Sequence, residues 1–174
     1  YEKYFQLPNS EVISISHGDI RDCRKKKKFS SERLRLSYLG PQGEAKGFFL
    51  LQAALDEWWK TNKQFCLNVY FTPIKPSPYM KPYGRYTYAD LETIFDNTDL
   101  VIVPSVWQET FGYVVLEALS CGVPVLISGN VGAKDILAPG AGIVIEDLTA
   151  EKLCRVLKNI TSEQLAGMNN VILE

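Results

Sequence analysis

The chain of 174 residues is 46% hydrophobic and 22% charged, the composition of one globular domain with a substantial core. Its 19 lysines and arginines balance 20 aspartates and glutamates, so overall charge favours neither nucleic acid nor an anionic surface as a partner. No apolar run is long enough to cross a membrane. The four cysteines are scattered and His17 is the one histidine, which argues against a disulfide framework, a zinc site and a Ser-His-Asp hydrolase.

Residues 1–33 start without a methionine or a signal peptide, so we expect them to lead into the domain from a preceding part of a longer protein. Six basic residues fall between Arg21 and Lys28, five of them from Arg24 to Lys28. Such runs are usually solvated, which favours a linker, and the alternative is a site for anionic lipid, phosphate or nucleic acid. No aromatic side chain interleaves the run, which argues against nucleic acid.

Beyond residue 33, strand-like and helix-like stretches alternate, which predicts an α/β fold with a Rossmann-like, doubly wound parallel sheet flanked by helices. We expect this domain to cover residues 34–160, with residues 161–174 as the start of a C-terminal helix. The predicted strands are Leu34–Leu39, Phe65–Phe71, Asp99–Val103 and Gly142–Ile145. The predicted helices are Gly47–Lys60, Asp90–Phe95, one after Gly112, one capped by Thr149 and one that begins at Thr161 or Ser162.

The same pattern predicts a proline-rich loop and the buried face of one helix. The prolines between Pro73 and Pro82 predict a surface loop without a domain boundary. The spacing within Gly47–Lys60 predicts a buried helix face made of Phe49, Leu50, Ala53 and Leu55.

The segment SVWQETFGYVVLEALSCGVPVL (105–126) places Glu109 and Glu117 eight positions apart, where a loop becomes an amphipathic helix. Gly112 falls near the helix N-terminus, at the carboxyl end of a parallel strand, where free amides and the helix dipole favour an anionic ligand such as phosphate. Carboxylates accept pairs of hydrogen bonds, which vicinal sugar hydroxyls donate. We therefore expect Glu109 on the loop and Glu117 in the helix to reach one cleft from different sides.

This segment resembles the E-x7-E motif of retaining glycosyltransferases with the two-domain GT-B fold, closest to glycosyltransferase family 4. ETFGYVVLEALSCGVPVLIS matches that pattern, and the resemblance extends to SGNVGAKDIL, to LRLSYLGPQGEAKGFFLLQAAL and to SISHGDI, from about Ser14 to Asn159. The resemblance implies that the chain is the C-terminal, donor-binding half of such an enzyme. An N-terminal acceptor-binding domain would precede it, the donor would be a nucleotide diphosphate sugar such as a UDP- or GDP-sugar, and no cofactor or metal would be required.

The resemblance also implies roles for particular residues. Glu109 would be catalytic and contact hydroxyls of the donor sugar, Glu117 would contact the ribose, and Lys46 would neutralise the diphosphate. The remaining expected donor-binding residues are the Gly112, Tyr113 and Val114 backbone, Phe111, Arg85 and Tyr86 near the base, and Ser105. From the residues alone, alternatives stay open: an exposed helix-end lysine for Lys46, core packing for the aromatics including Trp107, and a turn-stabilising hydroxyl for Ser105.

One position departs from the family pattern. Pro41 stands where the family usually has an arginine just after the glycine, so a bidentate phosphate ligand is missing, and Arg85 or Lys134 are the candidates to replace it.

For the full-length protein, the expectation is a hexosyltransferase in polysaccharide or glycolipid synthesis, cytoplasmic or in peripheral contact with the inner face of the membrane. This chain alone should give negligible transfer. Pro41 motivates the alternative, a non-catalytic nucleotide-binding or regulatory module of the same fold. Neither function uses nucleic acid as a partner.

Overall fold

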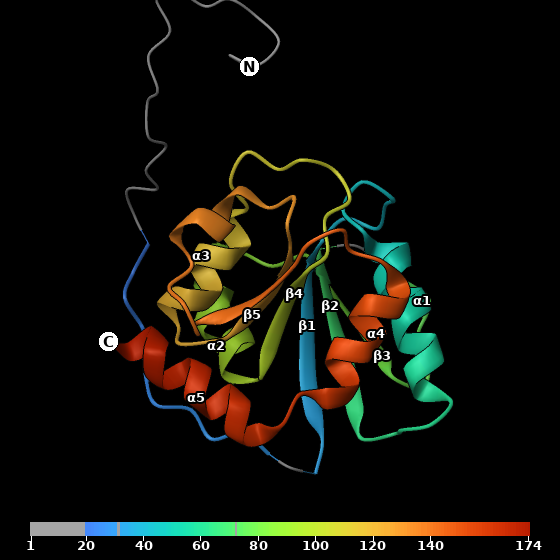
Figure 1. Cartoon of the computed structure of the whole chain (residues 1–174), viewed down its shortest axis with the longest axis horizontal. Coiled ribbons are helices and arrows are strands. Elements are labelled where there is room, and N and C mark those ends of the chain that lie inside the picture. The colour runs from blue at the N-terminus through green and yellow to red at the C-terminus, as the bar shows by residue number, and fades with distance from the viewer. Residues whose placement is uncertain (1–19, 31, 72) are drawn as a thin grey trace, which may run out of the picture.

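The chain folds into a three-layer α/β arrangement, seen in a computed structural model that describes residues 20–30, 32–71 and 73–174 (Figure 1). The expectations for His17 and for all of SISHGDI except Ile20 lie outside these residues. Six strands form one sheet in the order β3-β2-β1-β4-β5-β6, and each neighbouring pair is parallel, which confirms the doubly wound sheet. The strands are β1 Leu34–Gly40, β2 Phe65–Phe71, β3 Met80–Gly84, β4 Leu100–Val103, β5 Val125–Ser128 and β6 Gly142–Ile145.

Helices cover both faces of the sheet because side chains alternate between the two faces along each strand. Leu100 and Ile102 face one core, which α1 and α4 cover, whereas Val101 faces the other core, which α2 and α3 cover. Helix α5 runs along the lower edge of the sheet in Figure 1. The helices are α1 Phe48–Trp59, α2 Leu91–Asp96, α3 Tyr113–Ser120, α4 Ala150–Asn159 and α5 Ser162–Leu173, with short 3-10 turns η1 Tyr88–Asp90 and η2 Gly132–Ile136.

The predicted strands and helices are present, but two strands were missed and one helix face was predicted wrongly. Strand β3 begins within the predicted proline-rich loop and contains Pro82; β3 is the edge strand, where a proline removes no bond inside the sheet. Strand β5, of four residues directly after Pro124, was also absent from the prediction. The buried face of α1 is rotated by one residue from the predicted one. Phe49 and Ala53 are exposed, and the buried residues are Phe48, Leu51, Ala54, Leu55 and Trp58.

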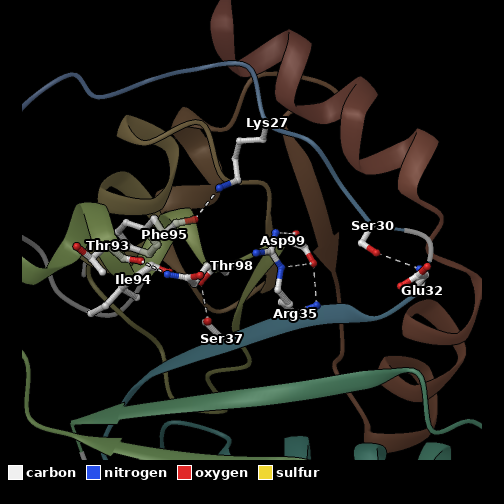
Figure 2. Close-up of polar contacts among 11 residues, drawn as sticks. Lys27, Ser30, Glu32, Arg35, Ser37, Thr93, Ile94, Phe95, Thr98 and Asp99 are labelled. Atoms are coloured by element: carbon white, nitrogen blue, oxygen red, sulfur yellow. Dashed lines mark hydrogen bonds and ion pairs between the residues drawn. The ribbon is translucent and has the colours of Figure 1, made fainter.

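A buried polar cluster aligns the two central strands at their amino ends (Figure 2). Asp99 is fully buried and receives two hydrogen bonds from the Arg35 side chain, at 3.1 and 2.5 Å, and a third from the Arg35 backbone amide. Beside this pair, Ser37 shares a 2.7 Å hydrogen bond with Thr98. The ladder between β1 and β4 pairs two residues on each strand, and this cluster adds side-chain bonds between the same two segments.

The basic run between Arg21 and Lys28 is mostly exposed, as expected of a solvated segment, but three of its six basic side chains also contact the domain. Lys27 donates to the Phe95 carbonyl in the last turn of α2, and Arg24 donates to the Ile172 carbonyl in the last turn of α5. Lys25 pairs with Asp96 at 2.7 Å, and burial lowers the pKa of Lys27. Cations are favoured near helix C-termini, so this segment holds the ends of two helices.

Candidate functional site

A cleft lies where the carboxyl ends of β1 and β4 meet. The chain continues from β1 toward β2 on one side and from β4 toward β5 on the other, so strand order reverses here, the usual ligand position in an open α/β sheet. The cleft has a volume of about 280 Å³. Its lining residues are Tyr38, Leu39, Gly40, Pro41, Lys46, Ile102, Val103, Glu109, Gly112, Tyr113 and Val114.

Two loops meet over this cleft, residues 41–47 after β1 and residues 104–112 after β4, both at the upper edge of the sheet in Figure 1. The Ala45 carbonyl accepts hydrogen bonds from the amides of Val106 and Trp107, each at 3.0 Å. Gly47 has a left-handed φ of 71°, and a Cβ there would lie 1.8 Å from the Pro104 carbonyl oxygen. Only a glycine permits this approach, which brings the two loops together.

Lys46 and Glu109 form the polar centre of the cleft. Lys46 Nζ lies 2.9 Å from Glu109 Oε1, although the two residues are far apart in sequence and come from different loops. The Glu109 side chain is 11% exposed and that of Lys46 is 44% exposed, so the carboxylate is fixed within the wall and the ammonium reaches toward solvent. The pair thus joins the two residues for which sequence predicted separate roles, on the sugar and on the diphosphate.

Helix α3 begins at the cleft without a capping side chain. Its N-cap residue, Gly112, has a φ of 96°, and a Cβ there would lie 2.7 Å from Val131 Cγ1. The first amides of a helix point out of its N-terminus, where the helix dipole also favours negative charge, so the start of α3 is a favourable position for an anion. This is the position that sequence analysis predicted for phosphate.

Five predicted site residues therefore line one cleft, and two others lie beside it. Lys46, Glu109, Gly112, Tyr113 and Val114 are in the lining. The ring of Phe111 packs against that of Tyr113 with centroids 5.3 Å apart, outside the lining. Ser105 is fully buried behind Glu109, to which its hydroxyl donates a hydrogen bond.

Glu117 lies one and a half turns into α3 and lines a separate pocket of about 150 Å³ with Tyr88 and Ser120. The expectation that both glutamates reach one cleft therefore does not hold for the cleft lining in this structure. The pKa of Tyr86 is raised to about 12, mainly by burial and to a smaller extent by the charge of Glu117. The two side chains therefore lie within electrostatic reach of each other. Glu117 and Tyr86 consequently form a second polar position, displaced along α3 from the Lys46 and Glu109 pair.

Neither candidate to replace the missing arginine points into the cleft. Arg85 is exposed and follows β3, which β2 and β1 separate from β4. Lys134 donates to the Gly129 carbonyl at 2.6 Å and lies 3.8 Å from Glu146. Trp107 is 70% exposed at the outer side of its loop, so it does not line the cleft either. Among the described lining residues, Lys46 is the one cation.

Tyr38 was missed by the sequence reasoning, although its place in LSYLG near the carboxyl end of a strand is a usable signal. Its hydroxyl donates to the Pro41 carbonyl at 2.8 Å, and burial together with the Glu109 charge raises the pKa of Tyr38. The tyrosine therefore fixes the backbone of Pro41, the residue that replaces the expected arginine.

Metal-binding clusters and membrane-spanning helices are both absent from residues 20–30, 32–71 and 73–174. In that part of the chain, no three His, Cys, Asp or Glu side chains gather where they could hold a metal ion. None of its helices combines the length and the apolar character that a membrane span requires.

Comparisons with known proteins point to one family. Residues 80–171 match the family model described as glycosyl transferases group 1. A GDP-mannose-dependent monoacylated alpha-(1-6)-phosphatidylinositol monomannoside mannosyltransferase of Corynebacterium glutamicum is 30% identical over 88 residues, which are 47% of this chain and 23% of that protein.

Two solved structures are similar in fold. The structure of HepE from Anabaena in complex with UDP and glucose aligns with a TM-score of 0.67 at 19% identity, over 79% of this chain and 42% of that chain. The C-terminal domain of the glycosyl transferase group 1 family protein LpcC from Francisella tularensis aligns with a TM-score of 0.67 at 14% identity, over 78% of this chain and 80% of that chain. The chain therefore spans less than half of the HepE chain and most of the isolated LpcC domain.

Proposed function

We propose, since the chain belongs to the glycosyl transferases group 1 family, that it is the donor-binding domain of an enzyme that transfers a sugar from a nucleotide diphosphate sugar to an acceptor hydroxyl. The observation that carries this proposal is the contact between Lys46 and Glu109 in a cleft at the carboxyl ends of β1 and β4. A cation for the diphosphate and a carboxylate for the sugar hydroxyls stand side by side, next to the uncapped start of α3.

The ion pair suggests how the donor enters. A diphosphate at the start of α3 would attract Lys46 and weaken its pairing with Glu109. The released carboxylate could then accept hydrogen bonds from the sugar. Binding of the two parts of the donor would be coupled through one side-chain exchange, because the same ion pair has to open for both.

The same groups would act in the reaction. As the sugar leaves, negative charge grows on the diphosphate, and Lys46 with the amides of Tyr113 and Val114 would stabilise it without a metal ion. Glu109, as the catalytic residue, would orient the sugar for a retaining, same-face transfer. Glu117, in the neighbouring pocket, would hold the ribose, and Tyr86, which is within reach of the Glu117 charge, would lie at the base side of the nucleotide.

The rest of the enzyme is proposed from the relatives. The Corynebacterium relative is named for a GDP-mannose donor and a phosphatidylinositol glycolipid, and the Anabaena structure contains UDP and glucose. We expect a hexosyl donor, a polysaccharide or glycolipid acceptor held by a separate N-terminal domain, a cytoplasmic location with peripheral membrane contact, and negligible transfer by this chain alone.

The first test is calorimetric titration of the chain with UDP, GDP, ADP and their sugars. We expect one nucleotide to bind. Lys46→Met should lower its affinity about 10- to 100-fold, because a hydrogen bond to a charged group contributes about 1.5–3 kcal/mol. Lys60→Met is the matched control, since Lys60 pairs with Glu57 on the surface at the end of α1. Failure of the parent chain to bind any nucleotide would contradict the proposal.

The second test separates an enzyme from a non-catalytic nucleotide-binding module, the alternative that Pro41 motivates. Glu109→Gln in the full-length protein keeps the side-chain shape but removes the charge. We expect a large loss of transfer rate with nucleotide binding retained. An unchanged rate would favour the non-catalytic module instead.

A further inference from the structure

We infer that Ser105 is a positioning residue for Glu109, and that Ser128 and Asn130 hold Ser105 in place. Ser105 follows Pro104 directly after β4 and is fully buried, so it cannot meet a ligand in the cleft. Its hydroxyl donates to Glu109 Oε1, the same oxygen that faces Lys46. The inference rests on the proposed function in one respect, that Glu109 is the residue that meets the sugar.

The Ser105 backbone is held from the end of β5. Its carbonyl accepts a 2.6 Å hydrogen bond from the hydroxyl of Ser128, which is 1% exposed, and a 3.3 Å bond from Asn130 Nδ2. Asn130 also donates to the Val106 carbonyl at 2.9 Å. A continuous chain of hydrogen bonds therefore leads from Ser128 through Ser105 to the carboxylate of Glu109. In a buried setting such bonds are stronger and fix one geometry.

Glu109 needs this side-chain support because its backbone bonds do not set its rotamer. Its amide donates to the Asn130 carbonyl at 2.8 Å and its carbonyl accepts from the Gly132 amide at 3.2 Å. These bonds place the Cα and leave the side-chain torsions of a glutamate free. The Ser105 hydroxyl selects one of the resulting carboxylate positions.

The arrangement matters most when Lys46 moves to a diphosphate. Oε1 would then lose the ammonium and keep the Ser105 hydroxyl, whereas Oε2 lies toward Gly112, 3.5 Å from where a Cβ would stand on that residue. The carboxylate stays oriented, with one oxygen held by the protein and the other available for a sugar hydroxyl. Ser105 thus prepares the site for the sugar half of the donor.

The first experiment needs no ligand. Because Lys46 also holds Oε1 in the ligand-free chain, the crystal structures compared at the Glu109 carboxylate are those of Lys46→Met with and without Ser105→Ala, and we expect the carboxylate to leave its position or to occupy several when Ser105→Ala is present. Ser105→Thr in place of Ser105→Ala keeps the hydroxyl and should restore the original position. An unmoved carboxylate in the double variant overturns the inference, whether or not the chain binds any nucleotide.

The second experiment measures how much the sugar adds to donor affinity. The affinities for UDP and UDP-glucose, and for GDP and GDP-mannose, are determined for the parent, Ser105→Ala, Ser105→Thr and a surface control, Ser162→Ala. We expect Ser105→Ala to lower the affinity for the sugar nucleotide about fivefold to tenfold and the affinity for the bare nucleotide less than twofold. Ser105→Thr should recover most of the loss.

A structural role for Ser105 would look different in these data. Equal weakening of nucleotide and sugar nucleotide, or no weakening of either, overturns the positioning role while leaving donor binding intact. A parent chain that binds neither pair contradicts the proposed function instead, and the crystal structures then decide the role of Ser105. Should Ser105→Ala fail to fold, Ser128→Ala tests the same chain of bonds, with a smaller loss in the same direction expected.

Discussion

The approach of the two site loops depends on Gly47, and replacing this residue tests the geometry of the cleft. In Gly47→Ala, the new methyl group would meet the Pro104 carbonyl oxygen at 1.8 Å, so the carbonyl has to move by about 1.2 Å to reach the closest contact that real Cβ atoms show. Overpacking of this kind costs about 1–3 kcal/mol. The left-handed φ of 71° adds about 1 kcal/mol for a residue with a Cβ. We expect a total loss of about 2–4 kcal/mol.

Two other glycines separate these contributions. Gly84 has a φ of 74°, and a Cβ added there would meet no neighbouring atom. Gly84→Ala should therefore lower the free energy of unfolding by about 1 kcal/mol, from the left-handed backbone conformation alone. Gly43 lies in the same loop as Gly47, has no left-handed φ and has open space, so Gly43→Ala should be neutral or gain up to about 1 kcal/mol.

Urea unfolding of the three variants and the parent measures the free energies, and the midpoint shifts should rank Gly47→Ala well above Gly84→Ala. Gly47→Ala should also weaken nucleotide binding, because Lys46 is the adjacent residue. Equal destabilisation by Gly47→Ala and Gly84→Ala would show that the contact with Pro104 does not hold the loops together.

Three further predictions concern other parts of the structure. Asp99→Ala leaves the Arg35 guanidinium without its carboxylate and should lower the free energy of unfolding by about 2–4 kcal/mol. This loss is smaller than for a fully buried pair because the Arg35 side chain is one third exposed. An unchanged midpoint in urea unfolding would contradict the role of this cluster. Glu117→Gln should lower the pKa of Tyr86 from about 12 while burial keeps it above its ordinary value, as followed by phenolate absorbance with Tyr86→Phe as the reference. Because the folded pKa is raised, the Tyr86 contribution to stability is present below about pH 10 and is lost toward pH 12. Thr149→Ala removes the side chain that accepts from the Lys152 amide at the start of α4 and should cost about 1 kcal/mol, so an unchanged melting temperature would argue against this cap.

Local patterns were sufficient for most elements and insufficient where a distant part of the chain decides. The helix caps at Thr149 and Thr161 were predictable because the cap and the amide it accepts from lie within one turn. Strand β3 was not predictable because Pro82 is acceptable only at a sheet edge, and strand order is not written in any one segment. The contacts of the basic run with the domain were not predictable because sequence does not show that the carbonyls of Phe95 and Ile172 lie beside it.

The same distinction between local sequence and tertiary structure holds for the candidate site. The amino-acid sequence by itself determined the residue types, a lysine at a helix start and a glutamate before a glycine at another, because these depend on short motifs and on the chemistry of phosphate and sugar hydroxyls. Only the tertiary structure decided that Lys46 and Glu109 touch, that Glu117 lines a different pocket and that Ser105 supports Glu109 from behind. Those relations depend on the order of the strands and on the close approach at Gly47, which packing across the whole sheet sets.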